Sequence, residues 1–231
     1  MSSVDLQTYL VFVSAAGALV LTPGPDTVFV LTQGVSAGKR GGVAAALGVS
    51  TGVLVHTTAA TLGLAALLRA SALAYAAVKY VGAAYLVYLG ARTLLRPDDF
   101  DLSASESVDL LAEADSRSGY PGGGYLRTSY RRGVTVNVLN PKVALFFLAF
   151  LPQFVGSGPD SGVASVAPAA EMLALGGTYA GLTALYLGAV GLLSGGVRSA
   201  LRSRPRFADG LRWVSGSVLV GLGAALALES P

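Results

Sequence analysis

Two prolines flank a glycine inside the first long apolar stretch of this chain, at Pro23-Gly24-Pro25, and Asp26 follows directly. Proline donates no backbone hydrogen bond and its ring clashes with the preceding helical turn, so the motif must break a helix that contains it. Within a bilayer, the freed backbone groups are tolerated only where they are buried in protein or line a cavity. A carboxylate at the break marks that cavity as polar. The stretch therefore predicts a broken membrane helix and one half of a polar site.

The composition indicates a membrane protein. Hydrophobic residues make up 53% of the 231 residues and charged residues 13%, whereas a soluble domain has about 25% charged residues. The absence of cysteine excludes disulfides, thiolate metal sites and dithiol redox chemistry. The start of the chain carries Asp5 and no basic residue, so we expect no cleavable signal peptide.

Six apolar stretches are each long enough for a membrane helix, which needs about 20 residues. The sequence thus predicts an all-α, polytopic protein with spans over residues 6–31, 41–68, 73–95, 133–150, 169–193 and 211–228. Between the third and fourth spans lies a polar segment whose acidic part runs from Asp98 to Asp115. Its composition is typical of a solvated linker. Whether it also has a regulatory role is left open by the sequence.

Most of the 16 lysines and arginines lie in the connections after the first, third and fifth spans. Positively charged connections stay in the cytoplasm, so we predict a multi-pass protein of the cytoplasmic membrane with both termini outside. The same clustering at helix ends argues against a nucleic-acid partner, which would require a basic surface stripe.

A second break is predicted in the fourth span, where Asn137-Val138-Leu139-Asn140-Pro141-Lys142 places a proline next to a charge and two amides. The third and sixth spans align without gaps from Lys79–Ala91 onto Arg212–Ala224. The halves therefore look like copies of one three-helix unit. An odd number of spans forces the second copy to enter the membrane upside down, which is the inverted-repeat plan of secondary transporters. We predict one transporter domain over 1–231, with repeats at 1–95 and 131–231 and a linker at 96–130.

Several motifs, in this order, resemble the lysine exporter and homoserine/threonine efflux family (LysE/RhtB type): Pro23–Thr27, the glycine-rich Gly38–Gly48, Lys79–Leu86, Asn137–Lys142 and Phe150–Phe154. The resemblance covers the chain except the acidic segment. It implies a six-helix inner-membrane exporter of amino acids or their derivatives, driven by the proton gradient, with helix breaks at Pro23, Gly24, Pro25 and Pro141. Many members of the family carry asparagine where this chain has Asp26.

The residues around the two breaks suit a free amino acid, which carries a carboxylate and an ammonium group. As a hypothesis, Lys142 or a half-helix N-terminus holds the carboxylate and Asp26 takes the ammonium. The candidate substrate-binding residues are Asp26, Lys142, Asn137, Asn140, Thr22 and Thr27, and the candidates for proton coupling are Asp26 and His56.

Structural alternatives exist for each of these roles. Asp26 and Lys142 would neutralise each other as a static ion pair, or Lys142 would snorkel to the lipid headgroups. The two asparagines would satisfy backbone groups freed by Pro141, and His56 would be an ordinary helix contact.

Other functions fit the sequence less well. A cation or metal permease needs clustered carboxylate, histidine or thiolate ligands, and an intramembrane enzyme needs a catalytic pair such as two aspartates. A non-transporting scaffold gains nothing from duplicated helix breaks. We therefore predict no enzyme activity, no cofactor and no metal, with an amino acid, protons and the lipid bilayer as partners. The identity of the amino acid and the formation of homo-oligomers stay open.

Overall fold

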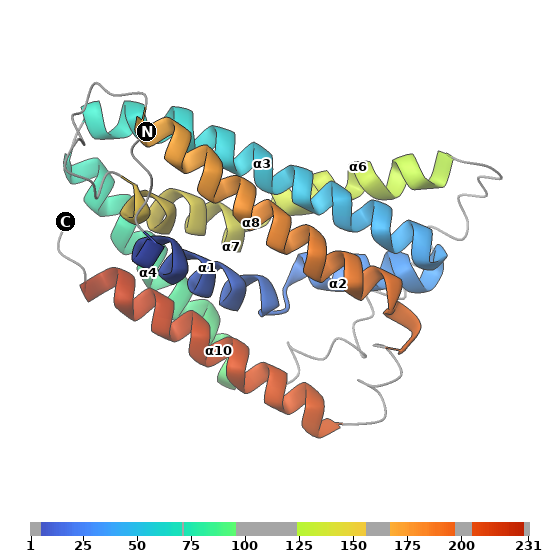
Figure 1. Ribbon diagram of the computed structural model, residues 1–231. Coiled ribbons are helices and arrows are strands. Elements are labelled where there is room, and N and C mark those ends of the chain that lie inside the picture. Colours follow the sequence, from blue (N-terminus) through green and yellow to red (C-terminus); the bar gives the residue numbers. More distant parts are fainter. Residues whose placement is uncertain (1–5, 71, 96–123, 156–166, 197–204, 229–231) are drawn as a thin grey trace.

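The computed structural model describes residues 6–70, 72–95, 124–155, 167–196 and 205–228. Every regular element in these ranges is a helix, which confirms the all-α prediction for this part of the chain (Figure 1). The acidic segment Asp98–Asp115 lies outside the described residues.

The first half of the chain contains four helices: α1 (Leu6–Leu21), α2 (Pro25–Ser36), α3 (Gly38–Ala70) and α4 (Ala72–Leu95). The second half contains α6 (Gly124–Val138), α7 (Pro141–Leu145), the π-helix η2 (Phe146–Phe150), the 3-10 helix η3 (Leu151–Phe154), α8 (Ala167–Leu192) and α10 (Pro205–Leu228).

Two helices begin well before the predicted spans, by six residues or more. α6 starts at Gly124 instead of residue 133, inside the segment predicted as a linker, and α10 starts at Pro205 instead of residue 211. The reason is the same in both cases: the apolar pattern marks only the part of a helix that lipid or protein covers, whereas the helix continues into polar turns. Proline suits the first position of α10, because the N–H group that it lacks would have no partner there.

Both predicted helix breaks coincide with sharp bends. α1 and α2 meet at 54°, and α6 meets the helical run that begins at Pro141 at 51°. By length and composition, α3 (over Gly38–Gly63) and α8 (over Ala169–Leu192) each qualify as a membrane span among the described residues, and two more spans are reached if each bent pair counts as one. The apolar part of α10, Arg212–Leu228, is shorter.

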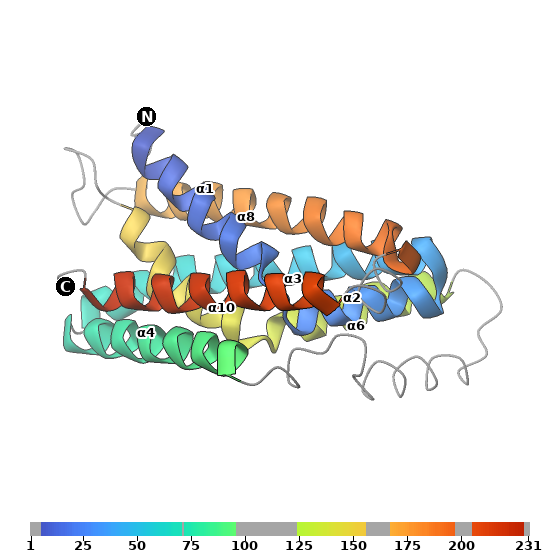
Figure 2. The ribbon, with the colours of Figure 1, turned by 90° about the horizontal axis from the view of Figure 1, so that it is seen from below.

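The helices form two groups, which are connected by α1 of the first broken helix and by η2 of the second. α3 packs along α6 and α8, and α4 packs along α10. α1 contacts α8 and α10, while α2 contacts α3, α6 and α8, so the break between α1 and α2 lies inside the bundle (Figures 1 and 2). The N-terminal end of α1 and the C-terminal end of α10 lie at one end of the molecule, and the connection between α2 and α3 lies at the other (Figure 1).

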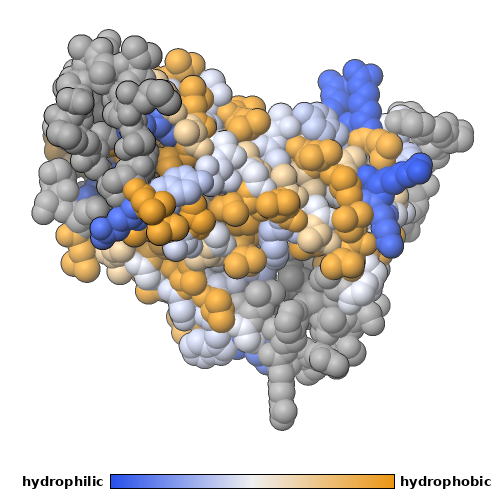
Figure 3. Space-filling model, in the orientation of Figure 1, coloured by the Kyte–Doolittle hydropathy of each residue, from blue (hydrophilic) through white to orange (hydrophobic). Residues whose placement is uncertain are grey.

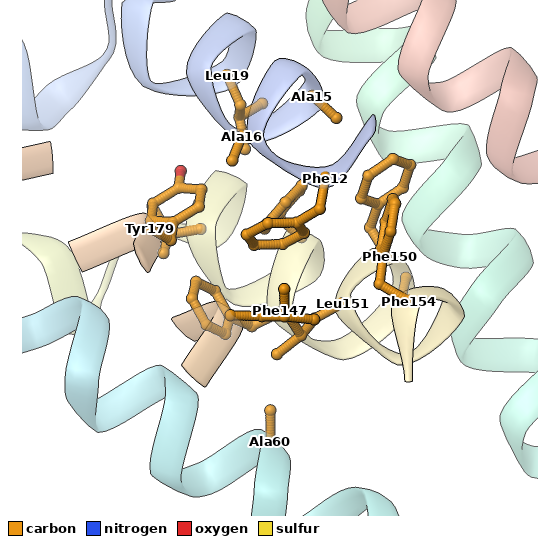
Figure 4. Packing of buried hydrophobic residues seen from close by; sticks show 14 of the residues in the cluster. Phe12, Ala15, Ala16, Leu19, Ala60, Phe147, Phe150, Leu151, Phe154 and Tyr179 are labelled. Carbon is orange, nitrogen blue, oxygen red and sulfur yellow. The ribbon is translucent and has the colours of Figure 1, made fainter. Parts of the chain in front are cut away.

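An aromatic cluster fills the space on one side of the breaks. It includes Phe12 of α1, Phe146 and Phe150 of η2, Phe154 of η3 and Tyr179 of α8 (Figure 4). The ring centroids of Phe12 and Phe154 are 5.3 Å apart, and those of Phe146 and Tyr179 are 5.1 Å apart. Contacts at this spacing stabilise a core beyond the burial of apolar area. The cluster fixes the second broken helix to α1 and α8.

Apolar side chains also cover much of the outer surface. Figure 3 shows them across the middle of one face, with strongly polar side chains mainly toward its ends. Large exposed hydrophobic residues include Leu10, Leu62, Tyr88, Leu185 and Trp213. An apolar surface of this extent is typical of helices that face lipid.

Candidate functional site

The first break leaves an uncapped helix start inside the protein. Gly24 is the N-cap of α2, has an extended backbone and provides no side-chain cap, and Pro25 occupies the first helical position. A Cβ atom at Gly24 would lie 3.1 Å from Lys142 Nζ, so glycine leaves room for that ammonium group. Asp26 follows in the first turn of α2 with 8% of its side chain exposed. A carboxylate at this position interacts favourably with the positive end of the helix dipole.

The second break is capped by its own asparagine. Asn140 is the N-cap of α7, and its Oδ1 accepts a hydrogen bond of 3.0 Å from the backbone N–H of Lys142. The N–H of Asn140 donates to the carbonyl oxygen of Asn137 at 2.9 Å. His56 Nε2 lies 3.0 Å from the same carbonyl oxygen, and its ring stacks on Phe147. Pro141 leaves carbonyl groups at the end of α6 without a helical partner, and these contacts satisfy one of them.

Side chains cross between the two breaks in both directions. Asp26 Oδ2, from the first half, accepts hydrogen bonds from Asn137 Nδ2 at 3.0 Å and Asn140 Nδ2 at 2.8 Å, both from the second half. Lys142 Nζ, from the second half, donates to the carbonyl oxygens of Thr22 at 2.9 Å and Leu19 at 3.4 Å, at the end of α1. A cation at the C-terminal end of a helix is stabilised by the helix dipole. Each half therefore supplies the group that stabilises the break of the other; we call these contacts the crossed break.

The structure bears on the alternatives for the two charges. Among the described side chains, no hydrogen bond joins Lys142 to Asp26, so the two do not form a direct ion pair. Lys142 is 7% exposed and its ammonium is bound to backbone carbonyls, which leaves no snorkelling to headgroups. The side chain of Asn140 does satisfy a freed backbone group, as the structural alternative requires, whereas the side chain of Asn137 donates only to the carboxylate of Asp26.

A small polar pocket lies beside the crossed break. Its volume is about 20 Å³, and its polar lining comes from Asp26, Thr27, Asn137, Lys142, Tyr179 and Thr183. This is room for about one water molecule. Three of its polar atoms, Asp26 Oδ1, Asn137 Oδ1 and Thr183 Oγ1, are buried and have no hydrogen-bond partner. Thr183 of α8 was not singled out from the sequence, because nothing in its spacing distinguishes it from other residues of an apolar helix.

A much larger apolar chamber lies on the other side of Thr27. Its volume is about 1100 Å³, and residues of α1, α2, α8 and α10 line it, mostly leucine, valine, glycine and alanine. The chamber reaches from Thr22 and Pro23 at the first break to Lys39 at the start of α3. Thr27 lines both spaces, and Tyr186 lines the chamber.

The structure thus brings most of the predicted site residues together, and the way in which each takes part differs. Asp26, Asn137, Asn140 and Lys142 meet in the crossed break, and His56 joins them through the Asn137 carbonyl. The hydroxyl of Thr22 donates to the Ala18 carbonyl of its own helix at 2.8 Å, so only its backbone carbonyl takes part. Within the described ranges, no group of three or more histidine or acidic side chains is arranged to hold a metal ion.

Comparison with known proteins identifies a family and several relatives. A family model described as LysE type translocator matches residues 17–230. An uncharacterized membrane protein of Pseudomonas aeruginosa is 32% identical over 98% of both chains. A leucine efflux protein of Klebsiella pneumoniae is 29% identical over 95% of this chain and 94% of its own length, and one of Salmonella choleraesuis is 34% identical over 68% and 66%. No solved structure is significantly similar to the chain.

Proposed function

The chain belongs to the LysE type translocator family, and on this premise we propose that it is a secondary transporter that exports amino acids across the cytoplasmic membrane. The observation that carries the proposal is the crossed break. There, buried Asp26 of the first broken helix binds side chains of the second, and buried Lys142 of the second binds the backbone of the first. Broken helices that meet within the membrane are where secondary transporters bind their substrates. Translocation, not catalysis, is the activity of the family.

The transporter is proposed to have six spans arranged as two inverted repeats, residues 1–95 and 131–231, with α6 beginning within the linker at 96–130. The contact between α4 and α10 supports this arrangement. A Cβ at Gly90 would lie 2.7 Å from Gly216 O and 2.7 Å from Val220 Cγ2, and a Cβ at Gly223 would lie 2.8 Å from Ala83 O and 2.8 Å from Val87 Cγ2. The alignment of Lys79–Ala91 with Arg212–Ala224 pairs Gly90 with Gly223, Ala83 with Gly216 and Val87 with Val220. The two contacts are therefore equivalent under exchange of the repeats. Such reciprocity is expected of a two-fold axis.

The proposed substrate is an amino acid with an uncharged, apolar side chain. The crossed break offers a carboxylate, an ammonium group and two amides to a zwitterionic head group, and the apolar chamber that begins at Thr22 and Thr27 offers space for a hydrocarbon side chain. A positively charged side chain would lose its hydration there and gain no acidic partner among the residues that line the chamber. The relatives named leucine efflux proteins agree with this substrate class.

Coupling to protons is proposed to run through Asp26. Export against a gradient requires a group that is loaded from one side of the membrane and unloaded to the other, and intramembrane carboxylates serve this purpose in transporters. His56 is a second candidate, since it contacts the carbonyl of Asn137, whose side chain binds Asp26. The positive connections orient the chain with both termini outside, so the chamber that reaches Lys39 faces the cytoplasm.

The test is counterflow of labelled leucine in proteoliposomes at two pH gradients. We expect the wild type to move leucine and to respond to the gradient. Asp26→Asn keeps the size of the side chain and removes the ionisable group, so exchange should continue at saturating leucine while the response to the gradient is lost. Asp209→Asn is the matched control, because Asp209 is exposed and pairs with Arg212 on α10. If Asp26→Asn retains the full response, the coupling role is wrong, and if the wild type moves no amino acid, the proposed function fails.

A further inference from the structure

The hydroxyl group of Thr183 differs from those of its neighbours. Serine and threonine in a helix usually donate to the carbonyl four residues earlier, and here Ser50, Thr57 and Thr22 do so at 2.8 to 2.9 Å. Thr183 is as buried as these residues, with 4% exposed, yet its Oγ1 has no partner. Leaving a buried hydroxyl unpaired costs free energy, and a ligand that binds this hydroxyl would remove the cost.

Two more unpaired acceptor atoms lie at the same place, Asp26 Oδ1 and Asn137 Oδ1. The two asparagine amides bind Asp26 Oδ2 and leave Asp26 Oδ1 without a partner. Asp26 from α2 and Thr183 from α8 both line the polar pocket of about 20 Å³. A carboxylate oxygen and a hydroxyl group that lack partners and line one small pocket together suit a ligand group that carries several N–H donors.

We propose that Asp26 Oδ1 and Thr183 Oγ1 form the subsite for the α-ammonium group of the transported amino acid. The inference rests on the proposed function and adds Thr183 as a residue that determines specificity. An ammonium group donates three hydrogen bonds and has about the volume that the pocket provides. The pocket admits this group and not the whole amino acid, whose side chain extends past Thr27 into the apolar chamber.

The charges around the subsite balance those of a zwitterionic substrate. Asp26 neutralises the ammonium group, and Lys142, which also lines the pocket, supplies the positive charge for the substrate carboxylate. Thr183 provides a dipole and no charge, so it recognises the amino group without changing this balance. A ligand without the amino group leaves both atoms unpaired.

The experiment compares two ligands that differ only in the amino group, leucine and 4-methylpentanoate. Each is used to inhibit labelled-leucine counterflow in proteoliposomes of the wild type, Thr183→Val and Thr183→Ser. We expect Thr183→Val to weaken inhibition by leucine by about ten- to a hundredfold, the size expected for one hydrogen bond to a charged group. Inhibition by 4-methylpentanoate should not change, and Thr183→Ser should behave like the wild type.

Thr57→Val is the matched control, because Thr57 is equally buried and its hydroxyl already has a partner in its own helix, the Val53 carbonyl at 2.9 Å. This variant should leave inhibition by both ligands unchanged. A structural role of Thr183 would make Thr183→Val weaken both ligands by the same factor, and a bystander role would leave both unchanged. Either result overturns the subsite while leaving export intact. Absence of leucine counterflow in the wild type would overturn the proposed function and the subsite together.

Discussion

The two oxygen atoms of one carboxylate have different roles in this site. Asp26 Oδ2 is held by two asparagine amides and Oδ1 has no partner. The side chain is thereby fixed in position while half of its capacity to accept hydrogen bonds is unused. Pre-organisation of this kind lowers the entropy cost of binding a ligand. The sequence identified Asp26 because a charge next to a proline break is conspicuous, and it missed Thr183 because a missing partner is visible only in three dimensions.

Lys142 is expected to support the first break. Replacing it with methionine keeps the aliphatic chain and leaves the buried Thr22 and Leu19 carbonyls without their donor. The loss should lower the free energy of unfolding by about 1–3 kcal/mol, the cost of an unsatisfied buried polar group. Thermal unfolding of the detergent-purified protein measures it. Lys39→Met, at an exposed lysine, should have no effect; an equal loss in both variants, or none in either, would contradict this role.

The elements depart from regular helices at the two breaks and in the segment that follows the second. Pro23, Pro25 and Pro141 act locally, through a missing donor and a ring clash, so the sequence predicts where these bends occur. The π-helical η2 and the 3-10 helix η3 were not predicted, because the path of Phe146–Phe154 depends on its packing with Phe12 and Tyr179. π-helical segments are frequent at functional sites. This one lies directly behind the crossed break.

The contact between α4 and α10 provides a test of the repeat. Gly90→Ala and Gly223→Ala each place a methyl group against the backbone of the other helix. Each should destabilise the protein by about 1–3 kcal/mol, as overpacking does in a close-packed core, and the two losses should be similar because the contacts are symmetry-related. Thermal unfolding again measures the effect. The control is Gly221→Ala, since a Cβ at Gly221 has no neighbour within 4 Å. Clearly unequal losses would argue against an inverted repeat.

At the scale of the whole molecule, the crossed break lies between a region filled with packed side chains and an unfilled chamber. The aromatic cluster fills the space on one side, and the apolar chamber of about 1100 Å³ begins on the other. Composition and apolar runs predicted a helical membrane protein, and duplicated breaks predicted where its halves meet. The chamber was not predictable, because its walls come from four helices whose spacing no local pattern encodes.

The central claim, that the crossed break binds the transported amino acid, is tested most directly by substrate protection of one cysteine. The chain contains no cysteine, so Ala18→Cys introduces a single thiol into the chamber at a half-buried position, about one turn before Thr22. The measurement is the rate at which a small thiol reagent modifies Cys at this position, with and without saturating leucine, in the presence and absence of the Asp26→Asn change. We predict that leucine slows modification and that Asp26→Asn weakens leucine binding and shifts this protection to higher leucine concentrations. Modification that leucine does not slow, or protection that Asp26→Asn leaves unchanged at every leucine concentration, would contradict the account.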